Sequence, residues 1–192
     1  MRNTHLLLLF LALVFAAGAS AQFRKIDTVA KMGDVGFKVS CSNKKIDNNP
    51  ITISPVGFKG SARPGYFNLK GVVTKIAVDD FNDDGFPDLV VFVYSGDSTE
   101  KGNVIAICSK DNTEIIPAYF ADIYNDPKLR IGYKGHDVFT DFAGTLLRTF
   151  PIYKPEDTDT PTGGKRVVQY KIMPGEGGSL TFKVLRTYEK PE

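Results

Sequence analysis

The sequence predicts an all-β fold, a single-domain antiparallel β-sandwich that carries one short Asp-rich, calcium-type loop between two strands. Short segments rich in Val, Ile, Phe and Tyr recur along the chain, and Gly, Pro, Asn or Asp bounds each of them. The sequence shows no long amphipathic helical pattern. Many short strands with turns at this spacing are typical of sandwiches and barrels.

The first half of the chain contains one alternating segment and three apolar runs of β-branched and aromatic residues, all expected to be strands. They are residues 35–40, 72–78, 89–94 and 103–108. A surface loop is expected over residues 57–65. Residues 114–124 are the one segment in which a short helix is considered.

The second half predicts four further strands, at residues 137–142, 145–153, 166–173 and 180–188. Ala143 and Gly144 form a tight turn between the first two. The polar segments 155–164 and 174–179 separate the others. We find no internal repeat and no interior linker, so the sequence predicts one domain.

Residues 1–21 have the pattern of a secretory signal peptide: Arg2, an apolar run from Leu6 to Ala17, and Ala19-Ser20-Ala21 as the cleavage site. The alternative is a membrane anchor, but the apolar run is too short to span a bilayer. No cysteine follows the cleavage site, so no lipid anchor is expected. We therefore expect residues 22–192 to be one exported domain, periplasmic or secreted and not inserted in the membrane.

The charge balance excludes one class of partner. The chain carries 24 Lys and Arg against 22 Asp and Glu. A near-neutral balance of this kind argues against a dedicated nucleic-acid binder and gives no signal for a membrane surface.

Cys41 and Cys108 are the two cysteines of the chain. In an exported protein, two cysteines most simply form one disulfide, which is the prediction made here. The alternative is a pair of buried free thiols.

The segment DDFNDDGFPD, Asp79–Asp88, is called the acidic loop. It has the pattern D-x-N-x-D-G-x-x-D, in which side-chain and carbonyl oxygens recur at the spacing of a calcium loop, with a glycine at the sharp turn. The candidate ligands of a structural calcium ion are Asp80, Asn82, Asp84, the Phe86 carbonyl and Asp88.

Position twelve of this pattern is Val91, so the loop lacks the glutamate of an EF-hand. It is similar instead to the nine-residue calcium loops of integrin-type propeller repeats, although a single copy does not make a propeller. The alternative is an ion-free turn, because Asp, Asn and Gly are also turn residues. Asp79 and Asp83 are expected to point outward, and the loop is expected to hold strands 72–78 and 89–94 together.

The sequence gives little support for an enzyme. His5 lies in the predicted signal peptide, which leaves His136 as the one histidine of the exported chain. No G-x-S-x-G, Cys/His or H-E-x-x-H pattern is present. His136 is expected to be a loop histidine bonded to its neighbours, because one histidine without a partnered nucleophile is no catalytic constellation.

Three motifs follow the acidic loop in a fixed order: GYKGHDV at Gly132–Val138, GTLLRTFPIY at Gly144–Tyr153 and PTGGKRVVQY at Pro161–Tyr170. With the acidic loop before LVVFVY, they resemble the periplasmic inhibitors of invertebrate-type lysozyme. The resemblance covers roughly residues 72–186. The residues of these motifs are expected to be structural: Pro and Gly shape a long hairpin, and aromatic residues fill one face.

The resemblance implies an exported β-sandwich, often a homodimer, that blocks a lysozyme. In the family, a loop after the strand matching residues 89–94 enters the enzyme's cleft, where its Ser and Tyr contact the catalytic carboxylates. The matching segment here is residues 95–103. Ser98 stands at the family Ser, whereas Lys101 stands where the family has Tyr. The expected lysozyme-binding residues are Ser95, Gly96, Ser98, Lys101 and Gly102.

Two other interpretations stay open. Residues 95–103 are also compatible with an ordinary solvated hairpin loop. The whole chain is compatible with a calcium-stabilised exported β-domain that binds another protein or a glycan and does not inhibit lysozyme.

Overall fold

The computed structural model describes residues 23–60 and 62–191, and this part of the chain is all-β. The predicted signal peptide lies outside the described residues. Twelve strands and two short 3₁₀ helices are formed. They are β1 (Ile26–Met32), β2 (Val35–Cys41), β3 (Asn49–Val56), β4 (Gly65–Leu69), β5 (Val72–Asp79), β6 (Asp88–Tyr94), β7 (Gly102–Lys110), β8 (Glu114–Tyr119), η1 (Ile123–Asn125), β9 (Val138–Phe142), β10 (Thr145–Pro151), β11 (Lys165–Pro174), η2 (Glu176–Gly178) and β12 (Leu180–Lys190).

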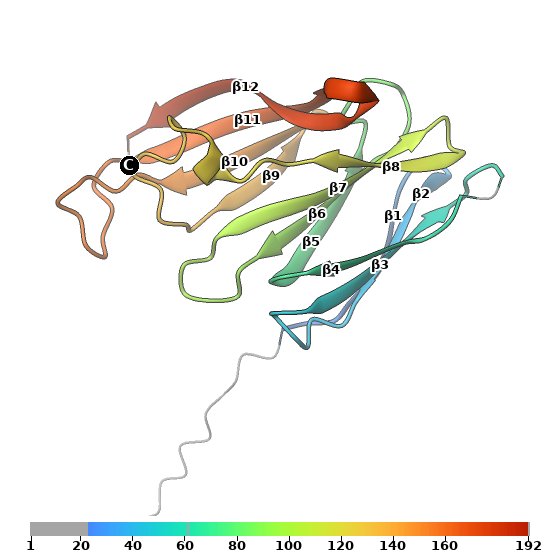
Figure 1. The fold of residues 1–192 in the computed structure, drawn as a ribbon, viewed down its shortest axis with the longest axis horizontal. Helices are drawn as coiled ribbons and strands as arrows, with labels where there is room; N and C mark the ends of the chain where they lie inside the picture. The colour runs from blue at the N-terminus through green and yellow to red at the C-terminus, as the bar shows by residue number, and fades with distance from the viewer. Residues whose placement is uncertain (1–22, 61, 192) are drawn as a thin grey trace, which may run out of the picture.

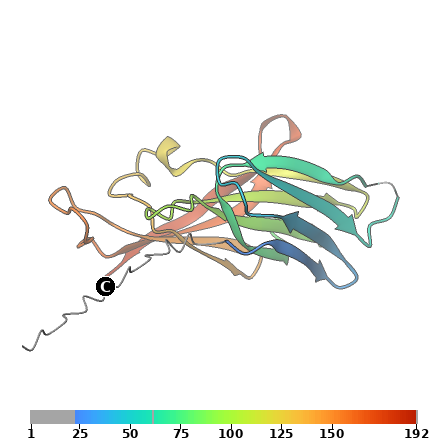
Figure 2. The same cartoon turned by 90° about the horizontal axis from the view of Figure 1, so that it is seen from below.

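The strands form two sheets, which confirms the predicted sandwich. A four-stranded sheet has the order β1-β2-β3-β4, and an eight-stranded sheet has the order β5-β6-β7-β8-β12-β11-β10-β9. All neighbours are antiparallel except β8 and β12, which pair in parallel. The four-stranded sheet lies along one side of β5–β7, with β9–β12 on the other (Figure 1). Figure 2 shows the 152–164 connection, in orange, projecting at the end opposite the four-stranded sheet.

Strand β6 is buried on both faces, which explains why its sequence is a continuous apolar run. Leu89, Val91 and Val93 pack into a core between the two sheets. Val90 and Phe92 point to the opposite side, into a second core enclosed by the eight-stranded sheet. The central strands therefore join two cores into one unit.

The eight-stranded sheet curls until its two edge strands, β5 and β9, approach each other. Lys75 Nζ on β5 lies 2.6 Å from Asp141 Oδ1 on β9. The Gly144 N–H, in the turn after β9, donates to Asp79 Oδ2 at 2.9 Å. These side-chain links cover edges that would otherwise be open.

The tight turn at Ala143-Gly144 is confirmed. Phe142 pairs with Thr145 across it, and both turn residues have positive φ, 44° and 63°. A side chain at Gly144 would collide with the Asp80 carbonyl, so this glycine also permits the acidic loop to approach.

The short helix considered within residues 114–124 is present only as η1, and the sequence missed four strands. Residues 114–119 form strand β8 rather than part of a helix, and only η1 is helical in that region. Strands β1, β3 and β4 were not predicted, because their apolar residues are interrupted by Lys, Asp, Ser, Pro and Asn.

The predicted disulfide was wrong: Cys41 and Cys108 are free and buried. Cys41 lies in the core between the sheets, where its thiol donates to Asn43 Oδ1 and Asn49 Oδ1 at 3.3 Å each. Cys108 lies in the other core. The two thiols therefore lie on opposite sides of the eight-stranded sheet and cannot form a disulfide.

Candidate functional site

The connection between β6 and β7, residues Ser95–Lys101, is called the probe loop. The Ser95 N–H donates to the Lys101 carbonyl at 2.9 Å and closes it. Inside it, Asp97 Oδ1 accepts hydrogen bonds from Ser95 Oγ at 2.8 Å, from the Thr99 N–H at 2.9 Å and from Thr99 Oγ1. These bonds, with that from Thr99 Oγ1 the largest cause, lower the pKa of Asp97 to about 2. Asp97 therefore shapes the loop from within.

The segment Gly135–Asp137 holds the probe loop from the side. The His136 N–H donates to the Thr99 carbonyl at 2.7 Å, and the Asp137 N–H donates to the Glu100 carbonyl at 3.2 Å. Gly135 has φ +109°, and a side chain there would collide with the Thr99 carbonyl. His136 is a loop histidine bonded to its neighbours, as expected, with Nδ1 3.6 Å from Glu100 Oε2.

A buried ion pair lies under the base of the probe loop. Arg148 Nε donates to Asp137 Oδ1 at 2.7 Å and Arg148 Nη2 donates to Asp137 Oδ2 at 2.9 Å. Nη2 also donates to the Gly102 carbonyl, while the Gly102 N–H donates to Asp137 Oδ2 at 2.6 Å. The side chains of Arg148 and Asp137 are 2% and 0% exposed. The pair thus fixes the residue at which the loop becomes strand β7.

Aromatic rings surround this pair. The Arg148 guanidinium lies 5.1 Å from the centroid of Tyr133, 5.4 Å from Phe139 and 5.8 Å from Phe150. The Tyr133 hydroxyl donates to Asp137 Oδ2 and accepts from Arg148 Nη2. Burial raises the pKa of Tyr133, so the phenol stays protonated and keeps its donor role.

The predicted binding residues divide into two groups. Ser95, Gly96 and Gly102 form the framework: Ser95 Oγ also accepts from the Lys101 N–H, and Gly96 adopts φ +78°. Ser98 is exposed in the turn of the loop, and Lys101 is exposed at its base, beside Gly102. Within the described residues, the Ser98 hydroxyl has no hydrogen-bond partner and Lys101 Nζ has no carboxylate within 4.0 Å.

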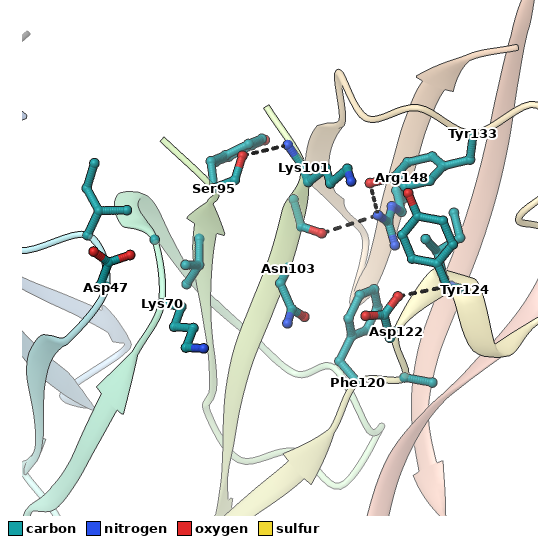
Figure 3. Close-up of a pocket in the computed structure, with 17 residues that line it drawn as sticks. Asp47, Lys70, Ser95, Lys101, Asn103, Phe120, Asp122, Tyr124, Tyr133 and Arg148 are labelled. Atoms are coloured by element: carbon teal, nitrogen blue, oxygen red, sulfur yellow. Dashed lines mark hydrogen bonds between the residues drawn. The ribbon is translucent and has the colours of Figure 1, made fainter. Parts of the chain in front are cut away.

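A hollow of about 270 Å³ lies beside the probe loop. Lys101, Phe120, Tyr124 and Arg148 line one side of it, and Asp47 and Lys70 lie on the far side (Figure 3). Lys101 Nζ is 5.4 Å from the centroid of the Tyr124 ring.

The acidic loop lies at the other end of β6, and its side chains bond mainly to its own backbone. Asp80 accepts from the N–H groups of Asp84 and Gly85, at 3.1 and 2.8 Å. Asn82 Oδ1 also accepts from the Asp84 N–H, and Asp84 Oδ1 accepts from the Phe86 N–H at 2.8 Å. These contacts bring four of the five predicted ligand positions into one turn.

The fifth predicted ligand, Asp88, is 0% exposed. Its two oxygens accept from the N–H groups of Phe81, at 3.0 Å, and Ser109, at 3.2 Å. Burial raises the pKa of Asp88 to about 7. Asp88 therefore ties the acidic loop to β7 from inside.

Asp83 points outward as expected, with its side chain 78% exposed, whereas Asp79 is only half-exposed. Asp83 Oδ1 lies 2.6 Å from Lys171 Nζ on β11, and Asp79 accepts from Gly144. The Ile172 N–H donates to the Phe81 carbonyl at 3.1 Å. The acidic loop thus connects the two ends of the curled sheet, and Lys171 supplies a positive charge beside it.

Across residues 23–60 and 62–191, no group of three or more His, Cys, Asp or Glu side chains is placed so that it could hold a metal ion. In the same residues, no helix is long and apolar enough to cross a membrane.

The sequence did not predict the partnership of Asp137 with Arg148, nor that of Tyr124 with Lys101. Asp137 and Arg148 were present in the quoted motifs GYKGHDV and GTLLRTFPIY. The pair could have been predicted from the sequence, because an acid and an arginine occur among aromatic residues in two adjacent predicted strands.

Comparison with known proteins gives one family match. The FG-GAP repeat model matches residues 72–107, from β5 through the acidic loop, β6 and the probe loop to β7. FG-GAP repeats often bind calcium and are typical of extracellular proteins. A search of the curated proteins finds no match.

Proposed function

We propose that this protein is an exported inhibitor of invertebrate-type lysozyme that occludes the glycosidase cleft with its probe loop and performs no chemistry of its own. One observation carries the proposal. Ser98 and Lys101, the two positions that the resemblance assigns to contact with the enzyme, have exposed side chains on the probe loop. Ser95, Asp97 and Thr99 instead bond to one another within the loop, and Glu100 lies against His136.

The loop is pre-organised, which supports an inhibitory role. Asp97 holds it from within, His136 from the side, and Gly102 is fixed by the Arg148–Asp137 pair. A loop that is already ordered loses less conformational entropy on binding, so more of the contact energy appears as affinity.

The chemistry of Ser98 and Lys101 matches a glycosidase cleft. Such clefts hold two carboxyl groups, and the one that acts as general acid must keep its proton. The Ser98 hydroxyl can bond to either carboxyl group. The Lys101 ammonium pairs with a carboxylate and keeps it ionised, because a nearby positive charge lowers the pKa of an acid. The enzyme is then both blocked and held in the wrong protonation state.

A lysis assay tests the proposal. Residues 22–192 are titrated against invertebrate-type, chicken-type and goose-type lysozymes. We expect stoichiometric loss of activity for the invertebrate type. Full activity of all three enzymes at excess protein would contradict the proposal.

Export is part of the same proposal and rests on residues 1–21. The expected mature N-terminus is Gln22 in the periplasm or the medium. Intact-mass measurement of the protein recovered from each fraction tests this, and a chain that retains Met1 in the cytoplasm would contradict it.

The FG-GAP match favours a second candidate function, a calcium-stabilised exported domain that binds another protein or a glycan. Asp80, Asn82, Asp84 and the Phe86 carbonyl offer the oxygen ligands that calcium prefers, and none of these residues is fully buried. Asp88 fits less well, because both of its oxygens already accept backbone N–H groups. We therefore propose the first four as the calcium ligands and Asp88 as their buried support.

Thermal unfolding tests the calcium proposal. For a dissociation constant of about 10⁻⁴ to 10⁻³ M, 10 mM calcium should stabilise the fold by about 1–3 kcal/mol relative to chelator. Asp84→Ala should abolish this gain. A melting temperature that is equal in calcium and in chelator would show that the acidic loop works without an ion.

A further inference from the structure

Tyr124 is an exposed aromatic side chain beside the probe loop. It lies on η1, is 44% exposed, and lines the hollow next to Lys101. Exposed tyrosines are frequent anchors of protein interfaces, because one ring gives a large contact area and a hydroxyl.

The Tyr124 ring is held in place from below. Its centroid lies 5.5 Å from that of Tyr133, with the two ring planes at 73°. Tyr133 is in turn fixed by its hydrogen bonds to Asp137 and Arg148. The buried cluster that positions the probe loop therefore also positions Tyr124.

The backbone at Tyr124 is fixed too. Asp122 caps η1, with Oδ1 accepting from the Tyr124 N–H at 2.9 Å, and Ile123 is buried in the core. An anchor with a fixed backbone and a packed ring loses little freedom on binding.

Lys101 is oriented by this ring, with its ammonium 5.4 Å from the Tyr124 centroid. Among the described residues, no carboxylate lies within 4.0 Å of Lys101 Nζ, whereas Glu100 faces His136 and Asp97 is bonded inside the loop. The charge at this edge of the loop is thus a lysine held over a tyrosine and available to a carboxylate.

We propose that Tyr124 is a specificity-determining residue of the inhibitory surface, which runs from Ser98 across Lys101 to Tyr124. Tyr124 supplies the aromatic contact that position 101 lacks, and it aims the Lys101 ammonium at a carboxylate of the partner's acidic cleft. The hollow that Lys101 and Tyr124 line from one side, about 270 Å³, receives the edge of that cleft. The proposal rests on the proposed function, because the partner is the glycosidase named there.

Calorimetric titration of invertebrate-type lysozyme with residues 22–192 tests the proposal. Tyr124→Ala should weaken binding at least about tenfold, as expected of an interface anchor. Tyr124→Phe, which keeps the ring, should stay within about twofold. Tyr119→Ala is the matched control, since Tyr119 is 61% exposed on β8 and does not line the hollow.

Coupling to Lys101 gives the second readout. If the ring orients the ammonium, the losses caused by Tyr124→Ala and Lys101→Ala should not add in the double variant. Tyr124→Leu retains an apolar contact with Tyr133 and guards against a purely structural effect. It should weaken binding as Tyr124→Ala does while keeping the wild-type melting temperature.

The outcomes are distinct. Absence of binding by the unmodified protein would remove the proposed function itself. If the unmodified protein binds lysozyme and both Tyr124→Ala and Tyr124→Leu bind it with the same affinity, only the role of Tyr124 is overturned. Fully additive losses would overturn the pairing of the ring with Lys101.

Discussion

The acidic loop and the probe loop lie at opposite ends of β6, and both are short polar turns that contain carboxylates and one glycine each. The carboxylates of the acidic loop have partners on the protein: its own backbone, β7 and, for the largely exposed Asp83, Lys171. The probe loop leaves Ser98 and Lys101 without such partners among the described residues. The side chains left unpaired, and not the density of charge, therefore mark the surface proposed to bind.

One carboxylate in each loop has a shifted pKa, and the two shifts are in opposite directions. Asp88 of the acidic loop is buried, which raises its pKa to about 7. Asp97 of the probe loop accepts three short hydrogen bonds in water, which lower its pKa to about 2. One carboxylate supports the sheet, and the other shapes an exposed loop.

The largest expected effect comes from the ion pair under the probe loop. Arg148→Ala leaves Asp137 buried without its counter-charge and should cost about 3–5 kcal/mol of unfolding free energy. Urea unfolding measures this. Lys75→Ala, which breaks the exposed pair with Asp141, is the control and should cost less than about 1 kcal/mol. Equal losses in the two variants would show that the buried pair has no special role.

The contrast between the carboxylates predicts two different titrations. Titration of the carboxyl groups followed by carbon-13 NMR should give a pKa of about 7 for Asp88 and of about 2 for Asp97. Values near 4 for both would remove the contrast.

The two pKa shifts make the unfolding free energy depend on pH in opposite directions. The folded pKa of Asp88 is raised, so its contribution is present below about pH 4 and is lost as the pH rises through about 7. The folded pKa of Asp97 is lowered, so its contribution is present above about pH 4 and is lost as the pH falls toward 2. Asp88→Asn should flatten the decline in unfolding free energy between pH 4 and 7.

A smaller effect separates the roles of the two loops. Lys171→Ala removes the pair with Asp83, which is largely exposed, and should cost about 0.5–1 kcal/mol of stability. Lysozyme binding should not change. Lys165→Ala on the same strand has no carboxylate partner among the described residues and is the matched control. A loss of binding in Lys171→Ala would show that the acidic loop also contributes to the contact surface.

The sequence predicted the all-β sandwich because its central strands have strong local signals. Strand β6 is apolar on both faces and β2 alternates, so both are recognised from their own residues. Strand β8 was missed because EIIPAY does not alternate and contains a proline, which weakens the local signal for a strand. Its place beside β7 and β12 comes from long-range pairing, which a local pattern does not contain.

The candidate site was predicted only in part, for the same reason. The loop residues Ser98 and Lys101 were named from the resemblance and the loop's polarity. Asp137 and Arg148 meet only after β9 and β10 pair and curl under the loop. The disulfide prediction was wrong because it rested on export and on the number of cysteines. Neither tells which face of a sheet each cysteine occupies.

The central claim is that Ser98 and Lys101 of the probe loop bind the enzyme. The most direct test is the affinity of Ser98→Ala/Lys101→Ala for invertebrate-type lysozyme, measured by calorimetry beside the unmodified protein and Asp83→Ala. We predict that binding by the double variant weakens by about a hundredfold or more, with an unchanged melting temperature, and that Asp83→Ala binds normally. Equal affinity of the double variant and the unmodified protein would contradict the claim.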